Sequence, residues 1–170
     1  RYYEPASEAM GKVRLADSRQ SSSFVLTEDM DEFSWIITSP PYYGMKTYVP
    51  DQWLRNWFLG GPSTVDYSYS GQLVHNGPAL FAADLRCVWR NVAAVSTDNA
   101  SMVVRFGGIP SRQACPKDML FESVKGSGWS IVSVSSAGTA RHGRRQAKSF
   151  LRSDSNPVEE YDFWMAKDIG

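Results

Sequence analysis

The sequence predicts a single α/β domain built on a largely parallel sheet. Short apolar and β-branched runs alternate along the chain with segments in which apolar residues recur at helical spacing. At 170 residues the chain is long enough to bury one core. No internal repeat, low-complexity tail or linker divides it, so we expect one domain over residues 1–170.

The first half of the chain holds two expected strands. Residues 12–16 alternate in polarity and end at Asp17-Ser18-Arg19, which predicts a strand followed by a turn. A polar stretch follows, and within it Thr27 is placed to cap a short helix over 27–32. The apolar run 33–38 then predicts a buried strand, because it is β-branched and aromatic.

The second half begins with an irregular insertion at about 45–77, rich in tryptophan, tyrosine, glycine and proline. One short helical face within it is formed by Trp53, Leu54, Trp57 and Phe58. These aromatic side chains, with Tyr48, either pack the insertion or line a channel for bases. The elements expected after it are a helix over 78–95, a strand over 102–106, a helix over 116–126, and strands over 129–134 and 161–166.

Composition excludes several classes of protein. The longest apolar run is too short to span a membrane, and the first residues lack the apolar segment of a signal peptide. Cys87 and Cys115 have no paired metal-binding spacing, and with only two histidines we expect no metal site. Two unpaired cysteines fit a reducing compartment, so a cytoplasmic location is expected.

Charge is balanced overall but uneven along the chain. The formal net charge of zero counts against a dedicated nucleic-acid-binding protein. A basic run without any acid nevertheless covers residues 141–152, where its cations are Arg141, His142, Arg144, Arg145, Lys148 and Arg152. This run either follows nucleic-acid phosphates or forms a solvated surface.

The segment Thr38-Ser39-Pro40-Pro41-Tyr42-Tyr43-Gly44 is the most informative feature of the chain. Each proline fixes its own φ and removes its own N–H, and each also makes the preceding residue extended. A strand that ends in this way leads into a stiff loop presenting a hydroxyl, free carbonyls and a flat ring. Such a loop suits a planar group that bears an amine.

The Ser39-Pro40-Pro41-Tyr42 loop resembles the catalytic signature of the DNA amino-methyltransferases. These enzymes use S-adenosyl-L-methionine to methylate the exocyclic amine of cytosine (N4) or adenine (N6). The resemblance implies a Rossmann-like methyltransferase fold whose mostly parallel sheet ends in an antiparallel hairpin. It further implies that this chain carries the catalytic half of that fold, with DNA as its partner.

The resemblance also implies roles for individual residues. The Ser39 side chain and the Pro40 carbonyl would accept hydrogen bonds from the amine, with Pro41 keeping the loop rigid. Tyr42 would stack on a base flipped out of the helix. A serine at the first position favours cytosine N4 over adenine N6. The remaining implied contacts are Tyr43, Arg141, Arg144 and Arg145 to the substrate, and Asp17 and Thr38 to the cofactor.

One departure from the family pattern leaves alternatives open. The Gly-x-Gly cofactor loop after a first strand is absent, so the chain is expected to be an incomplete methyltransferase. Its partner would then be the missing half or a second copy, in a restriction–modification setting. The alternatives are a non-catalytic remnant or binding module, or an enzyme that methylates an amine of RNA or protein. Asp17 is equally well explained as an ordinary turn residue.

Overall fold

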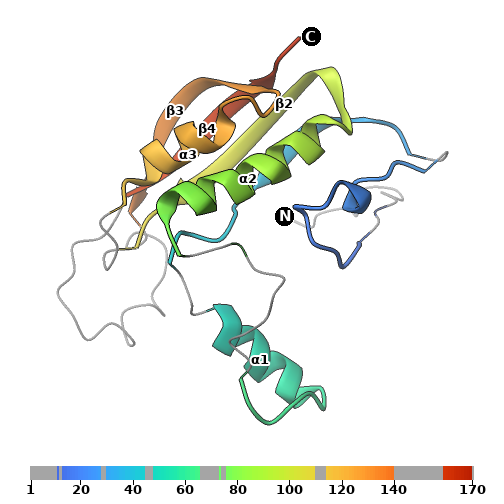
Figure 1. Cartoon of the computed structure of the whole chain (residues 1–170), viewed down its shortest axis with the longest axis vertical. Coiled ribbons are helices and arrows are strands. Elements are labelled where there is room, and N and C mark those ends of the chain that lie inside the picture. The colour runs from blue at the N-terminus through green and yellow to red at the C-terminus, as the bar shows by residue number, and fades with distance from the viewer. Residues whose placement is uncertain are drawn as a thin grey trace, which may run out of the picture.

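The computed structural model describes residues 11, 13–27, 30–44, 48–65, 73, 76–109, 114–139 and 159–169. Four strands and three α-helices make up these regions, together with one short 3₁₀ helix. In chain order they are η1 (Ser21–Ser23), β1 (Phe33–Thr38), α1 (Tyr48–Phe58), α2 (Pro78–Ala93), β2 (Ser96–Gly107), α3 (Pro116–Val124), β3 (Trp129–Thr139) and β4 (Glu159–Lys167) (Figure 1). The expected strands and helices from residue 33 onward are therefore present, with shifted ends.

The four strands form one sheet in the order β1-β2-β4-β3. β1 pairs with β2 in parallel, whereas β4 is antiparallel to both of its neighbours. The expectation of a mostly parallel sheet is wrong for the described strands, because β4 is inserted between β2 and β3 and makes two of the three pairings antiparallel. The expected antiparallel pairing of the last two strands is confirmed. β1, β2 and β3 consequently run in one direction, and their carboxyl ends share one edge of the sheet.

Helices α2 and α3 pack on the same face of the sheet (Figure 1). Phe81, Leu85 and Trp89 recur every four residues along α2 and are almost completely buried, as the helical pattern predicted. They meet alternate residues of the sheet: Ala100, Met102, Val104, Phe106, Phe163 and Met165. The buried indole of Trp89 donates a hydrogen bond to Ser123 Oγ at 3.0 Å, so this polar atom inside the core is satisfied.

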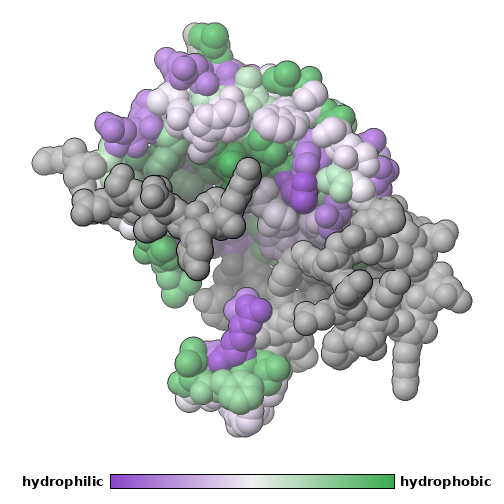
Figure 2. Space-filling model, turned by 180° about the vertical axis from the view of Figure 1, so that it is seen from behind, coloured by the Kyte–Doolittle hydropathy of each residue, from purple (hydrophilic) through white to green (hydrophobic). Residues whose placement is uncertain are grey.

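The other face of the sheet exposes apolar side chains. Trp35 and Ile37, which alternate with the core-facing residues of β1, are 58% and 80% exposed. The expectation of a buried strand over 33–38 is therefore wrong: β1 lies at the edge of the sheet, and none of its residues is fully buried. Trp164 continues this surface onto β4 and is itself exposed. Figure 2 views the molecule from this side and shows apolar residues among polar ones.

The segment before β1 differs from its expectation. Described residues 13–16 form no strand, and Val13 and Leu15 are exposed. The alternating pattern was insufficient because these residues pair with no strand of the described sheet. Residues 27 and 30–32, the described part of the expected helix, are not helical either; Met30 N–H donates to Thr27 C=O at 2.8 Å.

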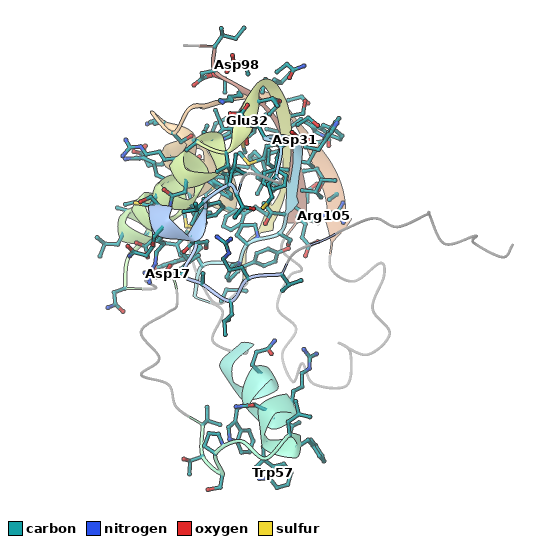
Figure 3. The ribbon with its side chains drawn as sticks, turned by 90° about the vertical axis from the view of Figure 1, so that its right-hand side faces the viewer. Asp17, Asp31, Glu32, Trp57, Asp98 and Arg105 are labelled. Atoms are coloured by element: carbon teal, nitrogen blue, oxygen red, sulfur yellow. The ribbon has the colours of Figure 1, made fainter. Side chains whose placement is uncertain are left out.

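Helix α1 confirms the helical face expected inside the insertion. It lies apart from the sheet, beyond the edge that carries the carboxyl ends of β1, β2 and β3 (Figures 1 and 3). The rings of Trp53 and Trp57 stack with centroids 6.3 Å apart, and Trp53 Nε1 donates to Pro62 C=O at 2.9 Å. Across the described residues, every helix is too short or too polar to cross a bilayer.

Candidate functional site

The Ser-Pro-Pro-Tyr loop follows β1 directly at the shared carboxyl edge. Thr38, the last residue of β1, is paired with Val104 of the parallel strand β2. Beyond it, Ser39 and Pro41 are exposed and Pro40 is half-buried. In open α/β sheets, ligands bind outside the carboxyl ends of parallel strands. The loop therefore presents its hydroxyl to solvent at the position where this class of fold holds substrates.

Tyr42 crosses the carboxyl end of β2 and reaches β4. Its hydroxyl donates a hydrogen bond to Glu160 Oε1 at 2.7 Å. Its ring meets the Phe106 ring edge-on, with centroids 5.7 Å apart and an interplanar angle of 83°. Two strands that lie far from the loop in sequence thus hold the one ring expected to stack on a base.

Gly107 makes this arrangement possible. A Cβ at this position would lie 3.3 Å from the Tyr42 ring and 3.0 Å from Glu160 Cγ. Both distances are shorter than most carbon contacts, so a side chain at 107 would require the ring or the Glu160 side chain to shift by a few tenths of an ångström. Glycine at 107 leaves room for Tyr42 and Glu160 to meet over this strand end.

Tyr43 lies in the core. Its side chain is 8% exposed, and its ring packs edge-on against Phe81 of α2 with centroids 5.5 Å apart. Phe81 in turn stacks on Phe106 of β2. The expected substrate contact through Tyr43 would have to come from a ring that is closed off from solvent, and the structure assigns this ring to anchoring the loop on α2.

Asp17 is held in a turn and not at the end of a strand of the sheet. Its carboxylate pairs with the Arg19 guanidinium at 2.7 Å, and Arg19 also reaches Asp84 of α2 at 3.2 Å. Hydrogen bonds from Arg19 lower the pKa of Asp17 to about 2. In Figure 3, Asp17 lies on the helix side of the sheet. This agrees with the turn interpretation, and the first strand expected to precede Asp17 is missing from the described residues.

The two residues expected to contact the cofactor lie in a strand pairing and in a turn. Thr38 is half-buried within the β1–β2 pairing, and the Asp17 carboxylate is committed to Arg19. Gly126-Ser127-Gly128 lies at the amino end of β3, on the edge opposite the Ser-Pro-Pro-Tyr loop. Gly126 has a φ of 63°, a left-handed conformation that ends α3. This glycine segment therefore forms the turn between α3 and β3.

Sequence reasoning missed the charged residues beside the loop. Arg105 of β2 donates two hydrogen bonds to Asp162 of β4, both at 2.8 Å. They lie on the same face of the sheet as Glu160, two residues away along each strand. The ion pair lowers the pKa of Asp162 and raises that of Arg105. Because the strands pair only in the folded sheet, nothing local in the sequence marks this cluster.

Arg141, Arg144 and Arg145 lie outside the described residues. The segment that contains them leaves β3 at Thr139 and joins β4 at Glu159. Both anchor points belong to the same edge of the sheet as the Ser-Pro-Pro-Tyr loop. Within the described regions, no group of three or more histidine, cysteine, aspartate or glutamate residues is placed to hold a metal ion.

Comparison with known proteins gives a structural similarity only. No protein-family model matches the chain, and no curated protein matches it. A crystal structure of TTHA0409 from Thermus thermophilus, described as a "putative DNA modification methylase", has a TM-score of 0.47 and 14% identity, over 92% of this chain and 53% of that one. Its selenomethionine derivative has a TM-score of 0.44 and 17% identity, over 91% and 52%.

TTHA0409 complexed with S-adenosyl-L-methionine also has a TM-score of 0.44, with 14% identity over 92% of this chain and 52% of that one. The chain thus spans about half the length of these structures, and it is similar over that half to a protein described as a DNA modification methylase.

Proposed function

We propose that this chain carries the amine-holding half of a Rossmann-like DNA methyltransferase. The observation that supports this function is the Ser39-Pro40-Pro41-Tyr42 loop at the carboxyl end of β1, beside the parallel strand β2. The sheet edge, the two prolines and the exposed hydroxyl together suit an aromatic amine. Cytosine N4 is the favoured target over adenine N6, because the first position of the loop is serine.

The loop would act on the nitrogen of the amine. The lone pair of an aromatic amine is delocalised into the ring, which makes the nitrogen a poor nucleophile. Two acceptors, Ser39 Oγ and the Pro40 carbonyl oxygen, would bind its N–H groups and favour a more tetrahedral nitrogen. Pro40 and Pro41 fix the backbone that directly follows Ser39. The two acceptors are therefore oriented before the base arrives.

The target base would have to leave the DNA helix to reach this loop. A flipped base loses its stacking partners, and an aromatic ring at the site replaces part of that energy. Tyr42 is the proposed partner, held between Glu160 and Phe106. DNA is therefore the proposed substrate, with Arg141, Arg144 and Arg145 as proposed phosphate contacts.

The proposed methyl donor is S-adenosyl-L-methionine, which supplies an activated methyl group. The role proposed for the described residues is to hold and orient the amine. The missing Gly-x-Gly loop of the sequence favours a second candidate function. A non-catalytic methyltransferase-like binding module would keep the loop and the sheet but would not transfer a methyl group.

Titration calorimetry with S-adenosyl-L-methionine separates the two functions. It is performed on this chain and on a longer form that includes the residues flanking it in the genome. Transfer of tritiated methyl groups to unmethylated plasmid DNA is measured on the same samples. Binding and transfer by either form would support the enzyme, whereas DNA binding without either would support the binding module.

Digestion of the methylated DNA to nucleosides then identifies the base. N4-methylcytosine is the expected product. If only N6-methyladenine is found, the choice of cytosine is wrong, although the proposed enzyme class is retained. If the label is found in RNA or protein added to the assay and is absent from the DNA, the proposed substrate class is overturned.

A further inference from the structure

We propose that Glu160 is a positioning residue that fixes the orientation of the Tyr42 ring over the end of β2. This inference rests on the proposed function, in which Tyr42 stacks on the target base. The Ser-Pro-Pro-Tyr motif includes no residue of β4, and Tyr42 and Glu160 are 118 positions apart. Only the insertion of β4 beside β2 brings the carboxylate to the loop.

Contacts with Glu160, Phe106 and Gly107 hold the ring. The hydroxyl is held by Glu160 Oε1 at 2.7 Å, and the ring meets Phe106 at 83°. The third contact is steric: Gly107 leaves room for the ring directly beside the strand. A tyrosine on a stiff loop can still rotate about its two side-chain torsions. Anchoring the hydroxyl, the atom farthest from the backbone, restricts χ1. Because the hydroxyl oxygen lies on the χ2 axis, χ2 is restricted instead by the Phe106 ring and by the strand at Gly107.

The sheet holds the backbone of Glu160 from both sides. In the β2–β4 pairing Glu160 lies opposite Gly107, and in the β3–β4 pairing it lies opposite Gly138. Neither neighbour has a side chain that competes for the space above the strand. Arg105, two residues before Gly107 on the same face, is attracted electrostatically by Glu160. The acceptor therefore sits on a paired central strand beside a cation.

A fixed ring matters for base stacking because the face of the ring must be parallel to the incoming base. Preorganising this face removes the cost of ordering the ring in each turnover. A hydrogen bond to a carboxylate is stronger than one between neutral groups, which suits it to this task. Glu160 is expected to act through Tyr42 and not to touch the substrate.

The test uses four variants of the chain. Glu160→Ala removes the acceptor, and Glu160→Gln keeps an acceptor oxygen without the charge. Tyr42→Phe removes the donor. Glu159→Ala is the matched control, because Glu159 is the adjacent carboxylate of the same strand and accepts hydrogen bonds from Ser136 and Tyr161 instead.

Two measurements are made on each variant. The first is the ¹⁹F NMR spectrum of protein labelled with 3-fluorotyrosine, in which the Tyr42 resonance is the one that disappears in Tyr42→Phe. The second is tritiated methyl transfer to plasmid DNA, analysed separately for kcat and for KM of the DNA. Since stacking follows DNA binding, loss of ring position is expected to lower kcat and leave KM unchanged.

The expected result is a shifted Tyr42 resonance and about a tenfold lower kcat in Glu160→Ala, the loss expected for one hydrogen bond to a charged group. In Glu160→Gln, the Tyr42 chemical shift and kcat should return most of the way to their natural values. In Glu159→Ala, the chemical shift and kcat should stay unchanged. An unmoved resonance in Glu160→Ala would overturn the inference, as would equal kcat values in Glu160→Ala and Glu159→Ala. If the unmodified protein transfers no methyl group, the proposed function fails, while the resonance still decides whether Glu160 holds the ring.

Discussion

The ring of Tyr43 packs edge-on against the ring of Phe81, with centroids 5.5 Å apart and an interplanar angle of 66°. Phe81 lies in the first turn of α2 and is completely buried. Tyr43 immediately follows the residue expected to stack on a base. The contact therefore joins the Ser-Pro-Pro-Tyr loop to the helix layer, so that the loop is part of the folded core at one end.

Replacing Phe81 by alanine should destabilise the whole domain and loosen the loop. Removing a buried aromatic side chain costs about 3–5 kcal/mol of the free energy of unfolding. Urea denaturation followed by far-UV circular dichroism measures this loss. Phe58→Ala on α1 is the matched control, because Phe58 is 76% exposed and its removal should change stability by less than about 0.5 kcal/mol. Equal losses in the two variants would contradict the packing described.

Gly107→Ala should disturb the Tyr42–Glu160 contact selectively. The added methyl group would lie 3.0 Å from Glu160 Cγ and 3.3 Å from the Tyr42 ring. Crowding of this kind lowers the free energy of unfolding by about 1–3 kcal/mol, a loss that thermal unfolding detects. The control is Gly11→Ala, where a Cβ would meet no atom within 4 Å. A Gly107→Ala protein as stable as the control would show that the ring and the carboxylate can move apart freely.

The Asp17–Arg19 pair predicts a small loss of stability in acid. Because the folded pKa of Asp17 is lowered to about 2, the carboxylate stabilises the fold at pH values above its unfolded pKa. That contribution is lost as the pH falls from about 4 toward 2, where the carboxylate becomes protonated in both states. The side chains are partly solvated, so the contribution should be below about 1 kcal/mol.

Urea denaturation of the natural chain and of Asp17→Asn, at pH 7 and again near pH 3, measures this contribution. The difference in free energy of unfolding between the natural chain and Asp17→Asn should be smaller near pH 3 than at pH 7. Asp31→Asn, at an exposed position, serves as the control. A difference that stays constant between the two pH values would argue against the ion pair.

Ser39→Ala should abolish most methyl transfer without unfolding the protein. Removing one preorganised hydrogen-bonding group from a reacting centre costs about 10²–10³ in kcat. Ser39 is exposed, so the melting temperature should stay unchanged. Transfer rates and thermal melts of the natural and altered proteins test both statements. Transfer at the natural rate would remove Ser39 from the proposed site.

Replacing three arginines by glutamine should weaken DNA binding in a salt-dependent manner. These residues are Arg141, Arg144 and Arg145. If all three contact phosphates, the slope of log K against log salt should become less steep by about 3. Fluorescence anisotropy with a labelled duplex at several salt concentrations measures the slope. A control with the same change in charge replaces Arg86, Arg90 and Lys125; an identical slope change there would indicate a general charge effect.

Local patterns predicted the helices after residue 33 and the loop well because their causes are local. The four-residue spacing of Phe81, Leu85 and Trp89 requires a helix with one buried face, and the structure has that face against the sheet. Pro40 and Pro41 restrict their own backbone wherever they occur, so the loop was predictable from its residues alone. The alternating polarity around Val13 and Leu15 predicted a strand wrongly, because a strand also needs a neighbouring strand to pair with.

By itself, the sequence determined which segments become helix or strand after residue 33 and which loop holds the candidate chemistry. Only the tertiary structure decided that β4 lies between β2 and β3, and therefore that Glu160 meets Tyr42 across 118 residues. It also decided that Asp17 is bound to Arg19 in a turn and that Tyr43 is buried. Pairings between distant segments depend on the strand order and register of the whole sheet, which no short stretch of residues encodes.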